Sequence, residues 1–421
     1  MKKVREGYKM TELGEIPGEW RVEKLCEIGE ILMGQSPVGD SYNSCGDGLP
    51  LLNGPTEFTN KSPIPKQWTT KPTKVCQNND ILFCVRGSST GRMNISNDKY
   101  CIGRGLAAIR GKEGVSITAF IYYFLQISIE RILNLSAGST FPNVSRDDLS
   151  GIPCILPCLK EQQKIADILS TVDEHIEETE SLIEKIKELK KGLMQRLLTK
   201  GIGHTKFKKT EVGEIPVEWE VKTIGELIEN SIPGEWGKEA ENLKDGLPII
   251  RSTNFCNNGK LDLKNIAYRK IDSKKVKKVI INKGDILLEK SGGGPDQPVG
   301  RVVYFNENGT FGYANFIQKL IVYKKYNPKT VFYFLHYFYL TRQVLRYQQQ
   351  TTGIINFQLK DFLGTAKIGI PINLQEQNEI SNILTKVDDE IEYYENYKEK
   401  LNALKKGLMQ KLLTGRMRVK V

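Results

Sequence analysis

The chain consists of one sequence unit that occurs twice. The motif Gly-Glu-Ile-Pro-x-Glu-Trp starts at Gly14 and again at Gly213, 199 residues later. Two further motifs recur at an offset of 215 residues: Glu-Gln-x-x-Ile-x-x-Ile-Leu begins at Glu161 and Glu376, and Gly-Leu-Met-Gln-x-Leu-Leu-Thr begins at Gly192 and Gly407. A repeat with matching edges and differing interiors predicts two related domains that have diverged in what they recognise.

The segments that follow Pro157 and Pro371 lack glycine and proline until Gly192 and Gly407, and both carry apolar residues at heptad spacing. This spacing predicts two long helices that meet along a shared seam. If each globular region returns the chain near its entry point, the second helix runs back along the first, so the pair is antiparallel and the halves are related by an approximate two-fold axis. The alternative is two amphipathic helices, each packed only on its own domain.

The region that precedes each long helix predicts an α+β domain. Buried strands are expected at 80–85, 101–109, 285–288 and 316–322, and helices at 115–133 and 328–346. The aromatic run 332–339 and its counterpart 120–125 are interpreted as core rather than as base-stacking platforms. The predicted fold class is therefore α+β, with two globular α/β domains joined by a long antiparallel two-helix coiled coil and an internal pseudo-two-fold repeat. The expected boundaries are 1–157, 158–200, 201–370 and 371–421.

Composition narrows the functional classes. The net charge is +11, and the range 201–370 carries +9 of it against +2 for 1–157. A basic surface of this kind attracts a phosphate backbone through counterion release. Met1-Lys2-Lys3 leads into charged residues and no apolar run reaches about 18 residues, so a cytoplasmic protein is expected. The eight cysteines form no Cys-x-x-Cys pair and are expected to be buried free thiols.

Catalytic and metal-binding patterns are absent from the sequence. There is no phosphate-binding Gly-x-x-x-x-Gly-Lys-Ser/Thr loop, and only three histidines are available for a triad or a metal site. Glu188-Leu189-Lys190 lies within the helical heptads, where a solvated helix face explains it. The tetrapeptide Asn53-Gly54-Pro55-Thr56 lacks the aromatic residue with which an amino-methyltransferase stacks on an extruded base. A non-catalytic protein with no cofactor or metal is expected.

Polar loops in each copy offer side chains suited to DNA. Arginine and lysine pair with guanine, asparagine and glutamine pair with adenine, and small polar residues fit phosphates. A single loop of this type more often simply turns the chain. The candidate DNA-binding residues are Gln35, Ser36, Asn53, Arg86, Ser88, Thr90, Arg92, Thr140 and Asn143 in the first copy, and Trp236, Lys238, Arg251, Thr253, Asn254, Lys290, Ser291, Arg301, Thr352 and Asn356 in the second.

The three repeated motifs together resemble the specificity (S) subunit of type I restriction-modification systems, and the resemblance covers essentially the whole chain. It implies two target-recognition domains that each read half of a bipartite, asymmetric site in double-stranded DNA, with the paired helices as spacer. It further implies docking to two modification (methyltransferase) subunits and two restriction subunits. S-adenosylmethionine, ATP and magnesium would belong to those partners.

Because a shared partner recognises what both copies have in common, Met194, Gln195, Met409 and Gln410 are the candidate partner-binding residues. Three other readings remain open: a coiled-coil scaffold without DNA affinity, an RNA-binding adaptor, and a self-sufficient nuclease or methyltransferase. The last of these requires one of the missing motifs.

Overall fold

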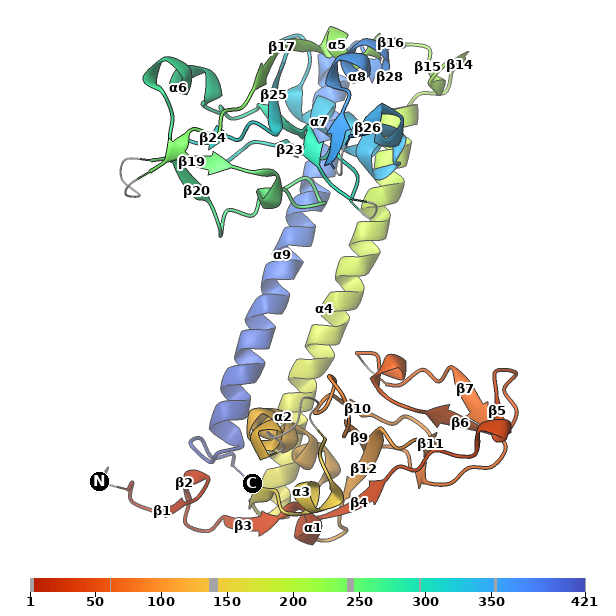
Figure 1. Cartoon of the computed structure of the whole chain (residues 1–421), viewed down its shortest axis with the longest axis vertical. Coiled ribbons are helices and arrows are strands. Elements are labelled where there is room, and N and C mark those ends of the chain that lie inside the picture. The colour runs from red at the N-terminus through yellow and green to blue at the C-terminus, as the bar shows by residue number, and fades with distance from the viewer. Residues whose placement is uncertain are drawn as a thin grey trace. The chain divides into compact units, whose positions relative to one another are not determined.

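The computed structural model describes residues 4–60, 62–135, 143–240, 246–294, 297–351 and 354–420. The chain divides into two units (Figure 1). Unit 1 comprises residues 1–182 and 394–421, and unit 2 comprises residues 183–393. Unit 1 is therefore completed by the C-terminal part of the chain.

The two copies share most of their elements in the same order, and the second copy has additional strands and one additional helix. The first copy consists of β1 (Tyr8–Thr11), β2 (Gly14–Pro17), β3 (Arg21–Lys24), α1 (Leu25–Ile28), β4 (Gly29–Met33), β5 (Tyr42–Asn43), β6 (Leu49–Leu52), β7 (Gln67–Thr69), β8 (Val75–Cys76), β9 (Ile81–Cys84), β10 (Met93–Ile95), β11 (Tyr100–Ile102), β12 (Leu106–Gly111), α2 (Thr118–Leu135), α3 (Arg146–Ser150), β13 (Pro153–Leu156) and α4 (Leu159–Lys200).

The second copy consists of β14 (Phe207–Thr210), β15 (Gly213–Pro216), β16 (Trp219–Thr223), α5 (Ile224–Leu227), β17 (Ile228–Pro233), β18 (Lys238–Glu239), β19 (Leu247–Ile250), β20 (Ala267–Lys270), α6 (Ser273–Val279), β21 (Ile286–Glu289), β22 (Ser291–Gly292), β23 (Val302–Tyr304), β24 (Gly312–Tyr313), β25 (Ile317–Val322), α7 (Pro328–Leu340), β26 (Gln348–Thr351), β27 (Ile354–Phe357), α8 (Leu359–Thr365), β28 (Lys367–Pro371) and α9 (Leu374–Leu412).

The main sheets of the two units share a common strand order. Unit 1 has a four-stranded antiparallel sheet in the order β10-β9-β12-β4, and unit 2 has its counterpart in the order β23-β21-β25-β17. A second sheet in each unit contains one parallel pair, β6 with β11 and β19 with β24. The strand order of the four-stranded sheet and of four strands of the second sheet is therefore repeated, whereas β8 in unit 1 and the three-stranded sheet β22-β27-β26 in unit 2 have no counterpart.

The four-stranded sheet is the middle layer of each unit, which explains why its inner strand β9 is apolar at every position. In β9, Ile81 and Phe83 belong to the core beneath the helices, whereas Leu82 and Cys84 face the second sheet. Alternate residues of a strand point to opposite faces, so a strand covered on both sides is apolar throughout. Strand β21 repeats this pattern, with Ile286 and Leu287 in different clusters.

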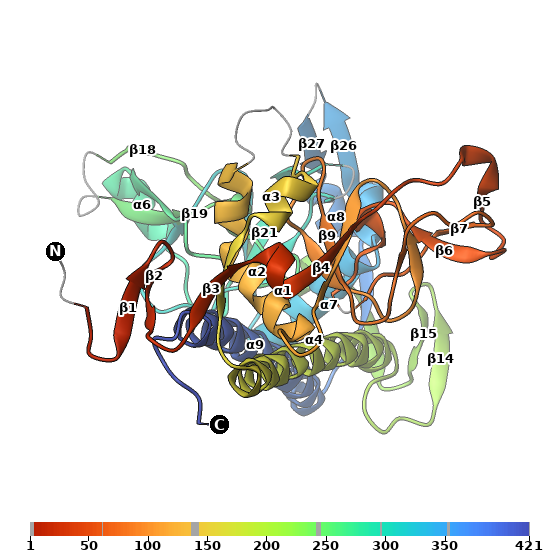
Figure 2. The same ribbon diagram turned by 90° about the horizontal axis from the view of Figure 1, so that it is seen from below.

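The long helices pair in antiparallel fashion within each unit. In unit 1, Lys405 of α9 contacts Asp173 of α4 at 2.6 Å and Lys398 contacts Glu180 at 3.3 Å, so the numbering falls in one helix as it rises in the other. Figure 2 shows α4 and α9 side by side. In unit 2, Leu197 and Leu198 of α4 share a core with Ile380 and Leu384 of α9. The expected antiparallel coiled coil is confirmed.

The repeated motifs meet at the start of each long helix. The Trp20 indole N–H donates to the buried Glu161 carboxylate at 2.9 Å, and the Trp219 indole donates to Glu376 at 3.2 Å. The next residue, Gln162 or Gln377, is fully buried and its amide donates to the carbonyl of Pro157 or Pro371. The Glu-Gln and Glu-Trp motifs are therefore one structural joint between strand and helix.

Three sequence-based expectations about the fold need correction. The apolar run 101–109 is not one strand, because a turn separates β11 from β12 and the two belong to different sheets. Helix α7 ends at Leu340, and Arg342 adopts a left-handed conformation (φ 58°) before a 3-10 turn at Gln343–Tyr347. Not all cysteines are buried, since Cys26, Cys45 and Cys158 are exposed. The aromatic run of α7 is core, as expected.

Candidate DNA interface

A β-turn lies at the centre of the candidate site in each unit. In unit 1, the Leu106 N–H donates to the Gly103 carbonyl at 3.0 Å, and the Gly103 N–H donates to the carbonyl of Leu52 at the end of β6 at 2.8 Å. This turn carries the chain from the second sheet into the four-stranded sheet. In unit 2, Ile317 and Ala314 make the same two bonds, at 2.9 Å each, the second of them to Ile250.

The loop after the first strand of the middle sheet packs on this turn. The Gln35 N–H donates to the Ile102 carbonyl at 2.9 Å, and the Glu235 N–H donates to the Tyr313 carbonyl at 2.9 Å. A Cβ atom on Gly34 would lie 2.2 Å from the Gly103 carbonyl oxygen. A Cβ atom on Gly234 would lie 2.2 Å from the Ala314 carbonyl oxygen. Both positions therefore require glycine for the close approach of the two backbones.

A third segment joins from the other side of the turn. The Val85 N–H donates to the Gly105 carbonyl and the Val144 N–H to the Val85 carbonyl, both at 2.9 Å, and Arg86 forms a β-bridge with Asn143. In unit 2, the Lys290 N–H donates to Phe316 at 2.7 Å, the Phe357 N–H donates to Lys290 at 2.8 Å, and Ser291 pairs with Asn356.

These bonds define loop cluster 1, residues 34–36, 53, 85–86, 103–105 and 143–144, and loop cluster 2, residues 234–235, 251, 290–291, 314–316 and 356–357. They also define equivalent positions without any sequence alignment. The equivalent pairs are Gln35 and Glu235, Asn53 and Arg251, Arg86 and Ser291, Arg104 and Asn315, and Asn143 and Asn356. One backbone arrangement thus presents two different sets of side chains.

The structure therefore brings together many of the residues singled out from the sequence. Gln35, Asn53, Arg86 and Asn143 are exposed, and Ser36 is half-buried beside them. In unit 2, Arg251, Lys290, Ser291 and Asn356 are half-buried within loop cluster 2. Ser88, Arg92, Lys238 and Thr253 are exposed but lie in neighbouring turns and strands, and Trp236 is half-buried. Thr140 and Thr352 lie outside the described residues.

The Arg251 guanidinium has one N–H group that is hydrogen-bonded within the domain and one that has no partner among the described residues. One terminal nitrogen of its guanidinium donates to the Asn265 carbonyl at 2.7 Å. Its Nε–H is buried without a hydrogen-bond partner among the residues that the structure describes. A buried donor of this kind costs free energy unless a ligand or water satisfies it. Nearby in unit 2, the Arg269 guanidinium stacks over the Trp236 ring at 4.3 Å. Burial also lowers the pKa of the Lys290 ammonium group.

Three candidates are structural residues rather than exposed ones. The Arg301 guanidinium makes bonds of 2.8 Å and 2.7 Å to the Glu289 carboxylate and also donates to the carbonyls of Phe255 and Ser252. Asn254 is buried, and its side chain bonds the backbone of Arg251 and Asp262. Thr90 is buried, with its hydroxyl donating to the Gly87 carbonyl at 2.7 Å. The expectation that these side chains face DNA does not fit their burial.

Arg104 and Asn315 occupy the same position of the central turn, and neither was predicted from the sequence as a DNA-binding residue. Both are exposed. They were missed because the first turn fell inside a run interpreted as one strand. A usable signal existed in Gly103-Arg104-Gly105, since two glycines around a charged residue are typical of a turn.

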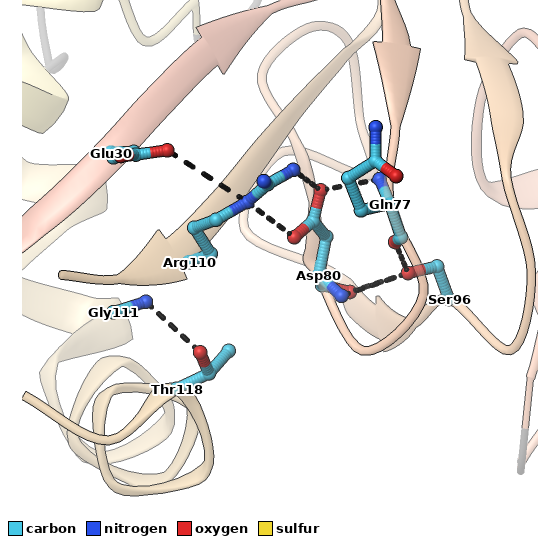
Figure 3. A network of polar contacts seen from close by, with 7 residues as sticks. All are labelled: Glu30, Gln77, Asp80, Ser96, Arg110, Gly111 and Thr118. Carbon is cyan, nitrogen blue, oxygen red and sulfur yellow. Dashed lines mark hydrogen bonds and ion pairs between the residues drawn. The ribbon is translucent and has the colours of Figure 1, made fainter. Parts of the chain in front are cut away.

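The strands that carry loop cluster 1 are joined by a polar network at their other ends (Figure 3). The Arg110 guanidinium of β12 donates to both carboxylate oxygens of Asp80, which precedes β9, at 2.9 and 2.8 Å. Glu30 of β4 lies 4.0 Å from the same guanidinium. Asp80 is held further by Ser96 and by the backbone of Gln77. Such bidentate pairs are geometrically specific, so the network fixes the register of the three strands that end at the loops.

The candidate partner-binding residues divide into two kinds. Met194 is 1% exposed and Met409 is 7% exposed, and each lies in the hydrophobic core of its unit. The adjacent Gln195 and Gln410 are exposed. The methionines thus explain the repeated motif through core packing, and only the glutamines present side chains to a partner.

Comparison with known proteins places this geometry in a family. The sequence model of the type I restriction modification DNA specificity domain matches residues 17–188 and 216–403. The chain belongs to this family. Its two matches correspond to the two copies of the repeat, so the family resemblance and the two-domain α+β fold with a coiled coil are both confirmed.

Individual relatives agree with this assignment. A putative type I restriction enzyme MjaX specificity subunit of Methanocaldococcus jannaschii is 40% identical over 196 residues, which is 46% of each chain. The MjaVIII specificity subunit of the same organism is 26% identical over 99% of this chain and 97% of its own length. The S subunit of a type I restriction-modification system from M. genitalium has the same fold, with a TM-score of 0.59 and 18% identity over 96% of this chain and 97% of its own.

A chain from a structural study of complex assembly and conformational transition in the type I R-M system also shares the fold. Its TM-score is 0.57 at 18% identity, covering 96% of this chain and 99% of its own length.

Within the described parts of the chain, no group of three or more histidine, cysteine, aspartate or glutamate side chains is placed to hold a metal ion. None of the described helices is both long and apolar enough to span a bilayer.

Proposed function

We propose that this chain is the DNA-reading subunit of a type I restriction-modification complex and recognises a bipartite, asymmetric site in double-stranded DNA. Unit 1 reads one half-site through loop cluster 1, and unit 2 reads the other through loop cluster 2. The observation that carries the proposal is the pair of clusters themselves. The same backbone bonds place Asn53 of unit 1 and Arg251 of unit 2 in equivalent positions, and they do the same for Arg86 and Ser291. The two side chains of each pair prefer different bases.

The division of labour in this proposal follows from the chemistry of the chain. The recognition domains run over about residues 1–157 and 201–370, and the helices of 158–200 and 371–421 set their spacing. Two modification subunits dock on surfaces that both copies share, near Gln195 and Gln410, and two restriction subunits join the assembly. Methyl transfer and cleavage, with S-adenosylmethionine, ATP and magnesium, belong to those partners, and this chain is non-catalytic. Such a complex acts on DNA in the cytoplasm.

Mapping of methylated bases in cells that carry this chain with its modification subunits tests the proposal. The expected result is one asymmetric motif made of two defined half-sites around an undefined spacer. Arg86→Ala should relax the first half-site only, at a cost of about 1 to 3 kcal/mol if its guanidinium pairs with a base.

The other readings predict different results. A coiled-coil scaffold gives no motif and no salt-dependent binding to duplex DNA. An RNA-binding adaptor is displaced from duplex by single-stranded RNA. A motif without a spacer would contradict the assignment of one half-site to each unit.

A further inference from the structure

The central turn of each loop cluster is the most constrained part of the candidate interface. Its backbone connects the two sheets and makes hydrogen bonds to two further segments. These are the loop after β4 in unit 1 or β17 in unit 2, and the segment after β9 or β21. In unit 1 the Arg104 N–H also donates to the Ser36 hydroxyl at 3.3 Å. A side chain that projects from such a turn starts from a fixed point, which direct reading of a base edge requires.

Arg104 meets the other requirements of a base-reading side chain. It is exposed, and no acidic side chain in the described part of the chain pairs with its guanidinium. The adjacent glycines let the neighbouring strand end approach, since a Cβ atom on Gly103 would lie 2.5 Å from the Asn53 side-chain oxygen and one on Gly105 would lie 2.6 Å from the Asn53 carbonyl. Arg104 is thus surrounded by the exposed polar residues of loop cluster 1.

The equivalent turn of unit 2 carries a different reader. Asn315 takes the position of Arg104, and Phe316 takes the position of Gly105. Phe316 is 49% exposed, although its backbone carbonyl accepts a hydrogen bond from the Lys290 N–H. An exposed apolar ring beside an exposed amide matches the major-groove edge of an adenine–thymine pair, where the amide bonds adenine and the ring contacts the thymine methyl.

We infer that Arg104 and Asn315 are equivalent specificity-determining residues, with Arg104 reading a guanine in one half-site and Asn315 reading an adenine in the other. This inference rests on the proposed function and extends it to residues at one structural position. The chemistry is the two-point bonding of a guanidinium to guanine O6 and N7 and of an amide to adenine N6 and N7.

The experiment exchanges the two side chains in the full chain assembled with its modification subunits. Duplexes of random sequence are selected by binding, and the enriched motifs are sequenced. Arg104→Asn should lower affinity for the original first half-site by about tenfold or more. It should change the preferred base at one position and leave the second half-site intact. Asn315→Arg should do the converse.

Two control variants separate base reading from other roles. Arg104→Lys keeps the charge but loses the planar fork, so it should relax the same base position if Arg104 reads a base and retain the motif if Arg104 contacts phosphate. Arg131→Asn removes an exposed arginine of α2 that is not one of the residues of loop cluster 1, and should leave both half-sites unchanged. Thermal unfolding of each variant confirms that its fold is intact.

The outcomes distinguish this inference from the proposed function. If the unaltered complex enriches no motif, the proposed function fails and the inference fails with it. If the unaltered complex enriches a two-part motif that Arg104→Asn and Asn315→Arg both leave unchanged, the inference alone is overturned. A loss of affinity spread evenly over all sequences also overturns it, because that result assigns Arg104 to the backbone.

Discussion

Two arginines at equivalent backbone positions have opposite roles in this protein. The Cys84 N–H bonds the Arg92 carbonyl, and the Glu289 N–H bonds the Arg301 carbonyl in the same way. Arg92 is exposed, whereas Arg301 is buried, because the facing strand supplies a carboxylate in unit 2 and a thiol in unit 1. The residue on the facing strand, eight positions before Arg92 in unit 1 and twelve positions before Arg301 in unit 2, decides whether such an arginine is available for DNA.

This pair of residues supplies a stability prediction with a built-in control. Arg301→Ala leaves the Glu289 carboxylate, which is 1% exposed, without its partner. Removing one partner of a buried ion pair costs about 3 to 5 kcal/mol. Arg92→Ala changes an exposed residue and should cost no more than about 0.5 kcal/mol. Urea denaturation followed by circular dichroism measures both. Equal effects of the two variants would refute the buried-pair argument.

His336 gives unit 2 a dependence on pH. Its ring is buried and stacked on Phe332, and burial lowers its pKa from 6.5 to about 3. As the pH falls below 6.5, the unfolded chain binds a proton that the folded chain does not, so unfolding becomes more favourable. Above pH 6.5 His336 leaves the free energy of unfolding independent of pH, and below it the loss of stability grows steadily toward pH 3.

We therefore expect the loss of stability on acidification to differ between the unaltered protein and a variant of His336. Between pH 7.5 and pH 5.0 the unaltered protein should lose more stability than His336→Gln, which cannot be protonated at this position. Thermal unfolding midpoints at the two pH values provide the measurement. A Gln variant that loses as much stability as the original over this range would show that other groups account for the acid sensitivity.

At the scale of elements, the long helices were predictable and the turns between strands were not. Heptad spacing depends only on residues a few positions apart, so the apolar positions Ile165, Leu169, Ile380 and Leu384 indicated buried seams that the structure confirms. The turn at Gly103 was missed because apolar residues continue on both sides of it and the two strands enter different sheets. That distinction depends on long-range pairing, which no local pattern reports.

A polar joint between helices is repeated in both units. In unit 2, the Tyr333 hydroxyl of α7 donates to Asp388 of α9 at 2.8 Å, and Lys190 of α4 lies 2.5 Å from the same carboxylate. In unit 1, Tyr123, Asp173 and Lys405 make the same arrangement. In each unit, a tyrosine of the domain and a lysine of one long helix both contact the carboxylate of an aspartate on the other long helix. This joint therefore couples the domain to the coiled coil.

Asp388→Asn tests the strength of the joint. Lys190 and Asp388 are only 12% and 17% exposed, so loss of the charge should destabilise unit 2 by about 1 to 3 kcal/mol. Glu184→Gln is the matched control on α4, since Glu184 pairs with Lys187 on an exposed face and such pairs contribute at most about 0.5 kcal/mol. Hydrogen exchange of α7 amides should quicken in the first variant only. Unchanged protection there would show that packing, and not this joint, holds α7.

At the scale of the whole molecule, the chain closes unit 1 with its own C-terminal segment. Arg418 donates to Glu161 at 2.6 Å and to Glu19 at 3.1 Å. In unit 2, His204 contacts the equivalent Glu376 and Glu218 at 2.8 and 3.1 Å. The segment after each long helix therefore completes a unit in the same way. The identity of the closing residues is not repeated between the units, so it required the structure.

The last prediction concerns the spacer between half-sites. Both long helices contribute to both units, α4 to unit 1 through its start and to unit 2 through its end. Adding seven residues to each helix, after Thr179 in α4 and after Tyr394 in α9, keeps the heptad seam in register. Each helix lengthens by about 10.5 Å at 1.5 Å per residue, which corresponds to about three base pairs. The preferred spacer should therefore lengthen while both half-site sequences stay the same.

Rotation sets the expected cost of this change. Seven helical residues turn the end of a helix by only about 20° relative to the heptad repeat, whereas three base pairs turn the duplex by roughly 100°. The DNA or the helices must twist to compensate, so affinity should fall as the spacer grows. Methylation mapping of the variant measures the spacer, and a variant with two extra residues, which breaks the seam register, should assemble poorly. Retention of the original spacing by the seven-residue variant would contradict the idea that the paired helices set the separation, even with the family assignment intact.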